Sequence, residues 1–204
     1  ITDFYREIIE DYSAIPRYLQ QQYGVTNGKD HGRIWRLIAD TPSSLPVSDM
    51  SDLTAGELAG EVGSDLFWRR QSSRRLLAEQ KLSETELADV TATLVDLAHD
   101  AKQPATVINA LHTLDALGKL TPEMITALFS HTDSGIRRQA LQLAETRISS
   151  QPKMLEAALK MADDSAPIVR LQLALTLGAS RDSKVLPSLV QLARQQGDDP
   201  WMTT

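Results

Sequence analysis

The side chains best suited to chemistry in this sequence are four arginines within one short stretch: Arg69, Arg70, Arg74 and Arg75. Guanidinium groups bind carboxylates through paired hydrogen bonds, so the cluster can form internal ion pairs or bind an acidic partner. Arg69 lies four residues after Asp65, a spacing that favours an internal pair on a helix. Arg70 and Arg74, together with Arg138 further along, are candidates for binding a partner, with a solvated face as the alternative.

Residue patterns typical of catalysis or metal binding are missing from the sequence. The four histidines show no i, i+4 pair and no His-Glu-x-x-His motif, which argues against a zinc site: His31, His99, His112 and His131. No Gly-rich phosphate loop and no Gly-x-Ser-x-Gly motif occurs. The absence of cysteine excludes disulfides, thiolate ligands and covalently attached haem within this chain. We therefore predict no catalytic residue, no metal and no cofactor here.

The net charge of the chain limits the classes of partner that it is expected to bind. The 204 residues carry a formal charge of −6, which argues against a nucleic-acid groove or an anionic membrane surface. No apolar run reaches the roughly 18 residues that would span a bilayer. Protein is therefore the expected partner, without nucleic acid and without membrane insertion.

The chain divides into three zones by composition. Residues 1–39 contain two strand-like stretches, 1–9 and 32–39, around a short helical one at 15–23. Residues 40–52 are rich in Pro, Ser and Thr and read as a linker. From residue 53 to 204, amphipathic helices follow one another, with capping-box and N-terminal proline signals at their starts. These signals predict helices at 53–62, 65–80, 83–99, 104–117, 122–130, 134–149, 152–162, 167–178 and 183–196.

The helices form a repeat. An aspartate precedes every second helix, at intervals of 31 to 35 residues: Asp65, Asp100, Asp133, Asp164 and Asp198. A two-helix unit of this length cannot bury its apolar stripe alone and must stack on its neighbours. The Asp and Arg positions resemble those of HEAT repeats. We expect an all-α, right-handed α-solenoid of four to five HEAT-like helix pairs, with a small irregular or β remnant at the N-terminus.

The resemblance to HEAT repeats assigns structural roles to several charged residues. A ladder of ion pairs along the stack would include Asp65, Arg69, Asp133, Arg137 and Arg170. Trp68 and Trp201 match the inward-facing position at helix starts, so we expect both in the core. We also expect Trp35 and Leu37 to pack the N-terminal zone against the first helices.

Three segments carry a further resemblance. "DFYREIIE" at 3–10 and "GRIWR" at 32–36 resemble the last propeller blade of the membrane-bound dehydrogenase family of planctomycetes, and "DLFWRRQSSRRLL" at 65–77 resembles that family's first HEAT repeat. In that family a β-propeller is followed by HEAT repeats and then by a c-type cytochrome. The resemblance implies a middle piece of an exported or periplasmic protein, with haem c in a module outside this chain.

These observations together predict a non-catalytic HEAT-repeat scaffold within a larger dehydrogenase–cytochrome protein. Its partners would be other modules of the same polypeptide or an extended peptide. The alternatives are a stand-alone enzyme on a HEAT-like frame, as in some DNA glycosylases and bilin lyases, and a general protein-binding adaptor.

Overall fold

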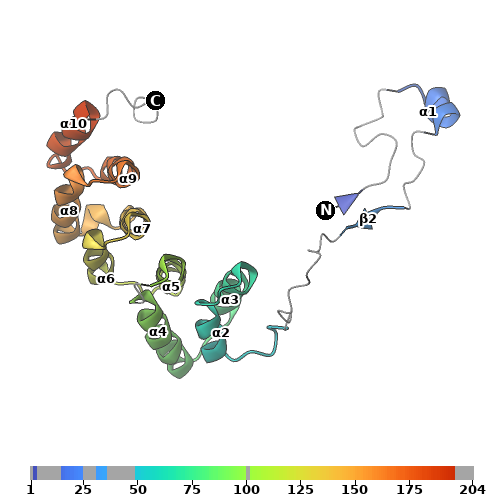
Figure 1. Ribbon diagram of the computed structural model, residues 1–204, viewed down its shortest axis with the longest axis horizontal. Helices are drawn as coiled ribbons and strands as arrows, with labels where there is room; N and C mark the ends of the chain where they lie inside the picture. Colours follow the sequence, from blue (N-terminus) through green and yellow to red (C-terminus); the bar gives the residue numbers. More distant parts are fainter. Residues whose placement is uncertain (1, 4–14, 25–30, 36–48, 100–101, 196–204) are drawn as a thin grey trace. The chain divides into compact units, whose positions relative to one another are not determined.

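The computed structural model describes residues 2–3, 15–24, 31–35, 49–99 and 102–195, which belong to two compact units, 1–48 and 49–204. In the first unit, β1 (Thr2–Asp3) pairs antiparallel with β2 (Arg33–Ile34), and α1 (Arg17–Tyr23) lies between them in sequence (Figure 1). The predicted short helix is confirmed. Most of the two predicted strands, and Leu37, lie outside the described residues.

The second unit is helical throughout its described part. The helices are α2 (Ala55–Glu61), α3 (Phe67–Glu79), α4 (Glu84–Ala98), α5 (Pro104–Ala116), α6 (Pro122–Ala127), α7 (Ser134–Ala144), α8 (Pro152–Leu159), α9 (Pro167–Gly178) and α10 (Val185–Gln195). Short 3-10 turns at Leu128–Ser130 and Lys160–Asp163 extend α6 and α8, and a third at Ile148–Ser150 follows α7. Every helix predicted after residue 52 is present, although α7 ends several residues before the predicted position 149.

The helix starts follow from local chemistry. Thr54 accepts a hydrogen bond from the Glu57 backbone N–H at 3.3 Å, while the Glu57 carboxylate accepts from the Thr54 N–H at 2.8 Å. Ser83 and Glu86 form the same reciprocal pair at the start of α4. These capping boxes satisfy N–H groups that the first helical turn leaves without partners. Prolines open α5, α6, α8 and α9, where the missing N–H costs nothing.

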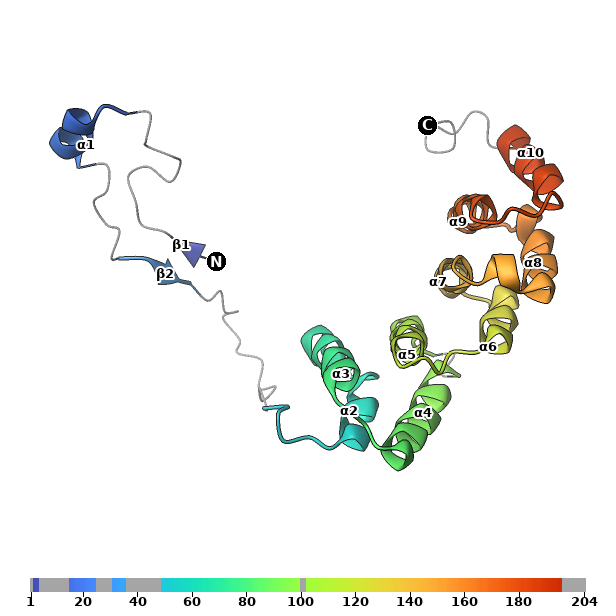
Figure 2. The ribbon, with the colours of Figure 1, turned by 180° about the vertical axis from the view of Figure 1, so that it is seen from behind.

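The helices of the second unit lie in two layers, which Figures 1 and 2 show from opposite sides. Helix α2 packs against α3 and α4, α4 against α5, α6 against α7, and α9 against α10. The described part of this unit thus alternates between the layers and forms an all-α solenoid of four helix pairs followed by α10. Within this unit the row curves, with α3, α5, α7 and α9 on its inner side (Figure 2). We call these four helices the inner layer and α2, α4, α6, α8 and α10 the outer layer.

A continuous apolar core lies between the layers. It runs from Met50 to Leu192, and each helix pair contributes side chains that its neighbours cover. The largest fully buried side chains include Leu58, Leu77, Leu94, Leu114, Ile125, Ile136, Leu141, Leu173 and Leu177. This is the burial that a stack of otherwise incomplete units requires. In the described part of the chain, no helix is long and apolar enough to cross a membrane.

The core prediction for Trp68 is wrong. Its side chain is 39% exposed, and its neighbour Phe67 is more exposed still. Helix α3 is the first inner-layer helix of this unit, so within the unit it has an inner-layer neighbour on one side only. Leu77, near the other end of α3, is fully buried. Trp201 lies outside the described residues, and Trp35, in the first unit, is half exposed.

Candidate functional site

The two layers differ sharply in charge. The inner-layer helices carry seven arginines and two acidic residues: Arg69, Arg70, Arg74, Arg75, Arg137, Arg138, Arg170, Glu79 and Asp115. The outer-layer helices carry eight acidic residues and two basic ones: Glu57, Glu61, Glu84, Glu86, Asp89, Asp96, Glu123, Glu156, Lys153 and Arg194. The inner layer is therefore basic, although the chain as a whole has a negative net charge.

Part of this basic charge is neutralised by ion pairs between successive repeats. Arg137 on α7 donates through Nε and Nη2 to the two carboxylate oxygens of Asp164, each at 2.7 Å. Both side chains are almost buried, with 11% and 9% of their surface exposed. The Arg137 guanidinium lowers the pKa of Asp164, and the carboxylate in turn raises the pKa of Arg137. The pair joins α7 to the loop that leads into α9.

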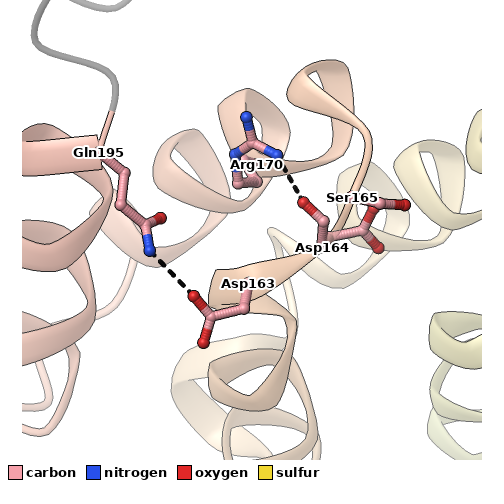
Figure 3. A pocket seen from close by; sticks show the side chains of 5 residues that line it. All are labelled: Asp163, Asp164, Ser165, Arg170 and Gln195. Atoms are coloured by element: carbon pink, nitrogen blue, oxygen red, sulfur yellow. Dashed lines mark hydrogen bonds between the residues drawn. The ribbon is translucent and has the colours of Figure 1, made fainter.

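The remaining predicted ladder residues occupy related positions. The Asp133 side chain caps α7 by accepting from the Ile136 N–H at 3.0 Å. Arg170 donates to the Asp164 backbone carbonyl at 2.5 Å, as Figure 3 shows. We expected Arg69 to pair with Asp65, but its Nε and Nη2 donate to the Glu61 carboxylate, each at 2.6 Å.

The change of partner at Arg69 has a structural cause. Asp65 precedes α3 and is not part of it, so the helical i, i+4 spacing does not apply. Glu61, the last residue of α2, lies across the turn between the two helices and supplies the carboxylate. The neighbouring guanidinium lowers the pKa of Glu61.

A small hollow of about 280 Å³ opens beside this ladder, between the loop at 163–165 and α10 (Figure 3). Its carboxylates are already occupied by side chains of the protein. The Asp163 carboxylate accepts from the amides of Gln191 and Gln195 at 2.8 and 2.9 Å, and Asp164 accepts from Arg137. These hydrogen bonds hold α10 against the preceding repeat, so the hollow is not a candidate binding site.

The three arginines that the sequence singled out for partner binding lie on the inner layer but do not form one cluster. Arg70 donates to the Ser64 carbonyl at 2.6 Å and contacts the Phe67 ring. Arg74 donates to the side-chain oxygen of Asn109 at 2.9 Å and is half buried. Arg138 is half buried on α7, and no ion pair of its own is found among the described residues.

The sequence analysis missed a row of amides that crosses the inner layer. Aligning the inner helices on their buried positions places Asn109, Gln139 and Gln172 at the same position of α5, α7 and α9, and Gln71 lies one residue before that position on α3. Asn109 accepts from both Gln71 and Arg74 on α3, and His112 Nε2 lies 2.8 Å from Gln139 Oε1. Between α7 and α9 the link is made by Thr176, whose hydroxyl donates to the Leu141 carbonyl at 3.0 Å.

The sequence does contain a signal for this row. Asn109, Gln139 and Gln172 each lie three residues after a buried β-branched residue: Thr106, Ile136 and Val169. Among the described residues, no group of three or more His, Asp or Glu side chains is placed to hold a metal ion. The inner layer thus offers guanidinium and amide groups, which are suited to binding by hydrogen bonds and charge.

Residues 121–201 match the family model of HEAT repeats, so this part of the chain is a HEAT-repeat region. The match covers α6 to α10, and the helix pairs that precede it, α2 with α3 and α4 with α5, have the same two-layer arrangement. Comparisons with the curated proteins and with the solved structures gave no match.

Proposed function

We propose that this chain is a non-catalytic scaffold whose inner layer binds an acidic segment of protein. The observation that carries the proposal is the concentration of arginine on the inner-layer helices α3, α7 and α9 in a chain whose overall charge is negative. HEAT repeats commonly mediate contacts between proteins, and the match over residues 121–201 supports a role as a repeat scaffold or interaction module.

The balance of free and paired arginines supports protein over nucleic acid as the partner. Arg69 and Arg137 have internal carboxylate partners, and Arg75 has an exposed one in Glu79. Arg170 lies close enough to the Asp164 carboxylate to help lower the pKa of Asp164. This leaves Arg70, Arg74 and Arg138 as the inner-layer cations with the least internal neutralisation. Binding to a duplex gains affinity with each phosphate neutralised, so three separated cations on an acidic chain favour a short acidic segment.

Site-specific photo-cross-linking in the cells that produce the protein tests this proposal. A benzophenone amino acid replaces Gln142, an exposed residue on α7 of the inner layer, and the matched control replaces Glu123 on α6 of the outer layer. The proposal predicts that the Gln142 variant forms a cross-link to protein in excess of the control, and that sequencing identifies an acidic segment. Equal yields at both positions, or cross-links to nucleic acid alone, would overturn it.

We further propose that the scaffold is part of a larger exported dehydrogenase–cytochrome protein. The support is the resemblance of segments 3–10, 32–36 and 65–77 to the planctomycete family described above. An antibody against this chain, used on fractionated source cells, provides the test. The proposal predicts a haem-staining band much larger than 22.5 kDa in the exported fraction. A band in the cytoplasmic fraction without haem would contradict it.

A further inference from the structure

A hollow of about 260 Å³ opens on the inner layer between α3 and α5. Its polar lining comprises Gln71, Arg74, Arg75, His112 and Thr113. The lining includes cationic and amide groups but no carboxylate. Liquid water occupies about 30 Å³ per molecule, so a space of this size accommodates a carboxylate side chain in place of several waters.

Arg74 lacks the counter-charge that comparable arginines in this structure have. Arg69, Arg137 and Arg147 each meet a carboxylate, from Glu61, Asp164 and Asp115. In contrast, the side-chain acceptors of Arg74 within the described residues are the neutral amide oxygens of Asn109 and Gln71, at 2.9 and 3.4 Å.

The environment of Arg74 makes this absence costly. Burial lowers the pKa of its guanidinium, because removing a charge from water disfavours the charged form. Its Nε is buried and has no hydrogen-bond acceptor among the residues that the structure describes. Guanidinium groups form their strongest contacts with carboxylates, through two parallel hydrogen bonds. A carboxylate arriving from outside would supply the missing counter-charge.

The surrounding groups favour an acidic side chain that comes from an extended segment. Arg75 is also part of the lining, and in its pair with Glu79 both side chains are more than half exposed. Gln139 lies on the next inner helix, where it contacts His112. Amides can both donate to and accept from a peptide backbone, so a segment that crosses from α3 to α7 meets suitable groups along its path.

We propose that the hollow between α3 and α5 is a carboxylate-binding pocket in which Arg74 receives a Glu or Asp side chain of an extended acidic segment. This inference rests on the proposed function, since it assigns a position to the partner. Arg74, which donates to the Asn109 amide oxygen, lines the pocket, and Arg75 adds a second positive charge to the lining. We expect salt to weaken the pairing between Arg74 and this carboxylate, because the ion pair would be partly exposed.

A fluorescence anisotropy titration of the 204-residue chain tests the inference. The probe is a fluorescein-labelled twelve-residue peptide of alternating Glu and Ala, and the same peptide with Gln in place of Glu is the neutral control. The variant is Arg74→Gln, and the matched control is Arg75→Gln, which removes the same charge from the adjacent position. Circular dichroism verifies that each variant keeps its helix content.

The inference predicts that the Glu–Ala peptide binds the unaltered chain while the Gln–Ala peptide does not. Arg74→Gln should weaken binding about tenfold or more, as loss of a charge-assisted hydrogen bond does, and Arg75→Gln by about twofold. Arg74→Lys keeps the charge without the planar fork and should give an intermediate affinity.

Three results would overturn the pocket. One is equal affinity of the Arg74→Gln variant and the unaltered chain, another is no binding of the Glu–Ala peptide, and the third is binding of duplex DNA in its place. If Arg74→Gln reduces the helix content, the comparison between Arg74→Lys and the unaltered chain decides. Cross-linking at Gln142 does not depend on Arg74, so a failure of this pocket and a failure of the proposed function are distinguishable.

Discussion

The Arg137–Asp164 pair provides the sharpest stability prediction. Asp164→Asn keeps the shape of the side chain but removes its charge, so the nearly buried guanidinium of Arg137 loses the carboxylate to which it is hydrogen-bonded. The substitution also weakens the contact with the Ala166 N–H, which donates to Asp164 Oδ1 at 2.9 Å. Because the pair joins two successive repeats, its loss weakens the interface between neighbours.

The expected magnitude follows from the burial and from what remains bound to Arg137. Removing one member of a buried ion pair costs about 3–5 kcal/mol. Arg137 keeps its hydrogen bonds to the carbonyls of His131 and Thr132, at 2.8 and 3.0 Å, so the cost falls at the lower end of that range. We therefore expect Asp164→Asn to lower the free energy of unfolding by about 3 kcal/mol, a large part of the roughly 5–15 kcal/mol typical of a folded domain.

Urea unfolding followed by circular dichroism measures this loss. With a slope of about 1–3 kcal/mol per molar urea, the midpoint should fall by about 1 M or more. Glu79→Gln is the matched control, since it breaks the Arg75–Glu79 pair, in which 62% and 58% of the side chains are exposed. Such exposed pairs contribute about 0.5 kcal/mol or less. If Asp164→Asn lowers the free energy of unfolding no more than Glu79→Gln does, the buried ion pair does not stabilise the stack and the reasoning is refuted.

Three further predictions follow from the same structure. Arg137 lowers the pKa of Asp164 from an ordinary value near 3.8. The stability advantage of the unaltered chain over Asp164→Asn should therefore be constant above about pH 5 and shrink as the pH falls through the lowered pKa. An advantage that is unchanged at about pH 2 would contradict this prediction. Leu114→Ala, at a fully buried position, should cost about 2–5 kcal/mol in urea unfolding, whereas Leu175→Ala, 58% exposed, should cost far less; equal losses would contradict the assigned core. Ser83→Ala removes the cap of α4 and should cost about 1 kcal/mol, while no measurable change in the urea midpoint would show that the cap is dispensable.

The helices were predictable because their signals are local. The hydroxyl and carboxylate of a capping box lie three residues apart, and a proline at a helix start acts through its own backbone. The aspartate spacing also gave the two-helix period, because each repeat must present the same face to its neighbours. Those two kinds of signal were enough to predict an all-α solenoid.

The contacts between repeats were harder to predict. Arg69 meets Glu61 because of the angle of the turn between α2 and α3, which the residue spacing does not encode. Arg74 and Asn109 are 35 residues apart, and their contact depends on how far each inner helix is shifted along its neighbour. Trp68 was misplaced for a similar reason, since its exposure depends on the position of α3 in the row and not on the sequence of α3.

The central claim, that the inner layer is the face that binds protein, is tested most directly by hydrogen exchange. The measurement compares the free chain with its complex with the segment recovered by cross-linking at Gln142. The account predicts slower exchange of backbone amides in α3, α5 and α7, and unchanged exchange in α4, α6 and α8. Slower exchange confined to the outer-layer helices would contradict it.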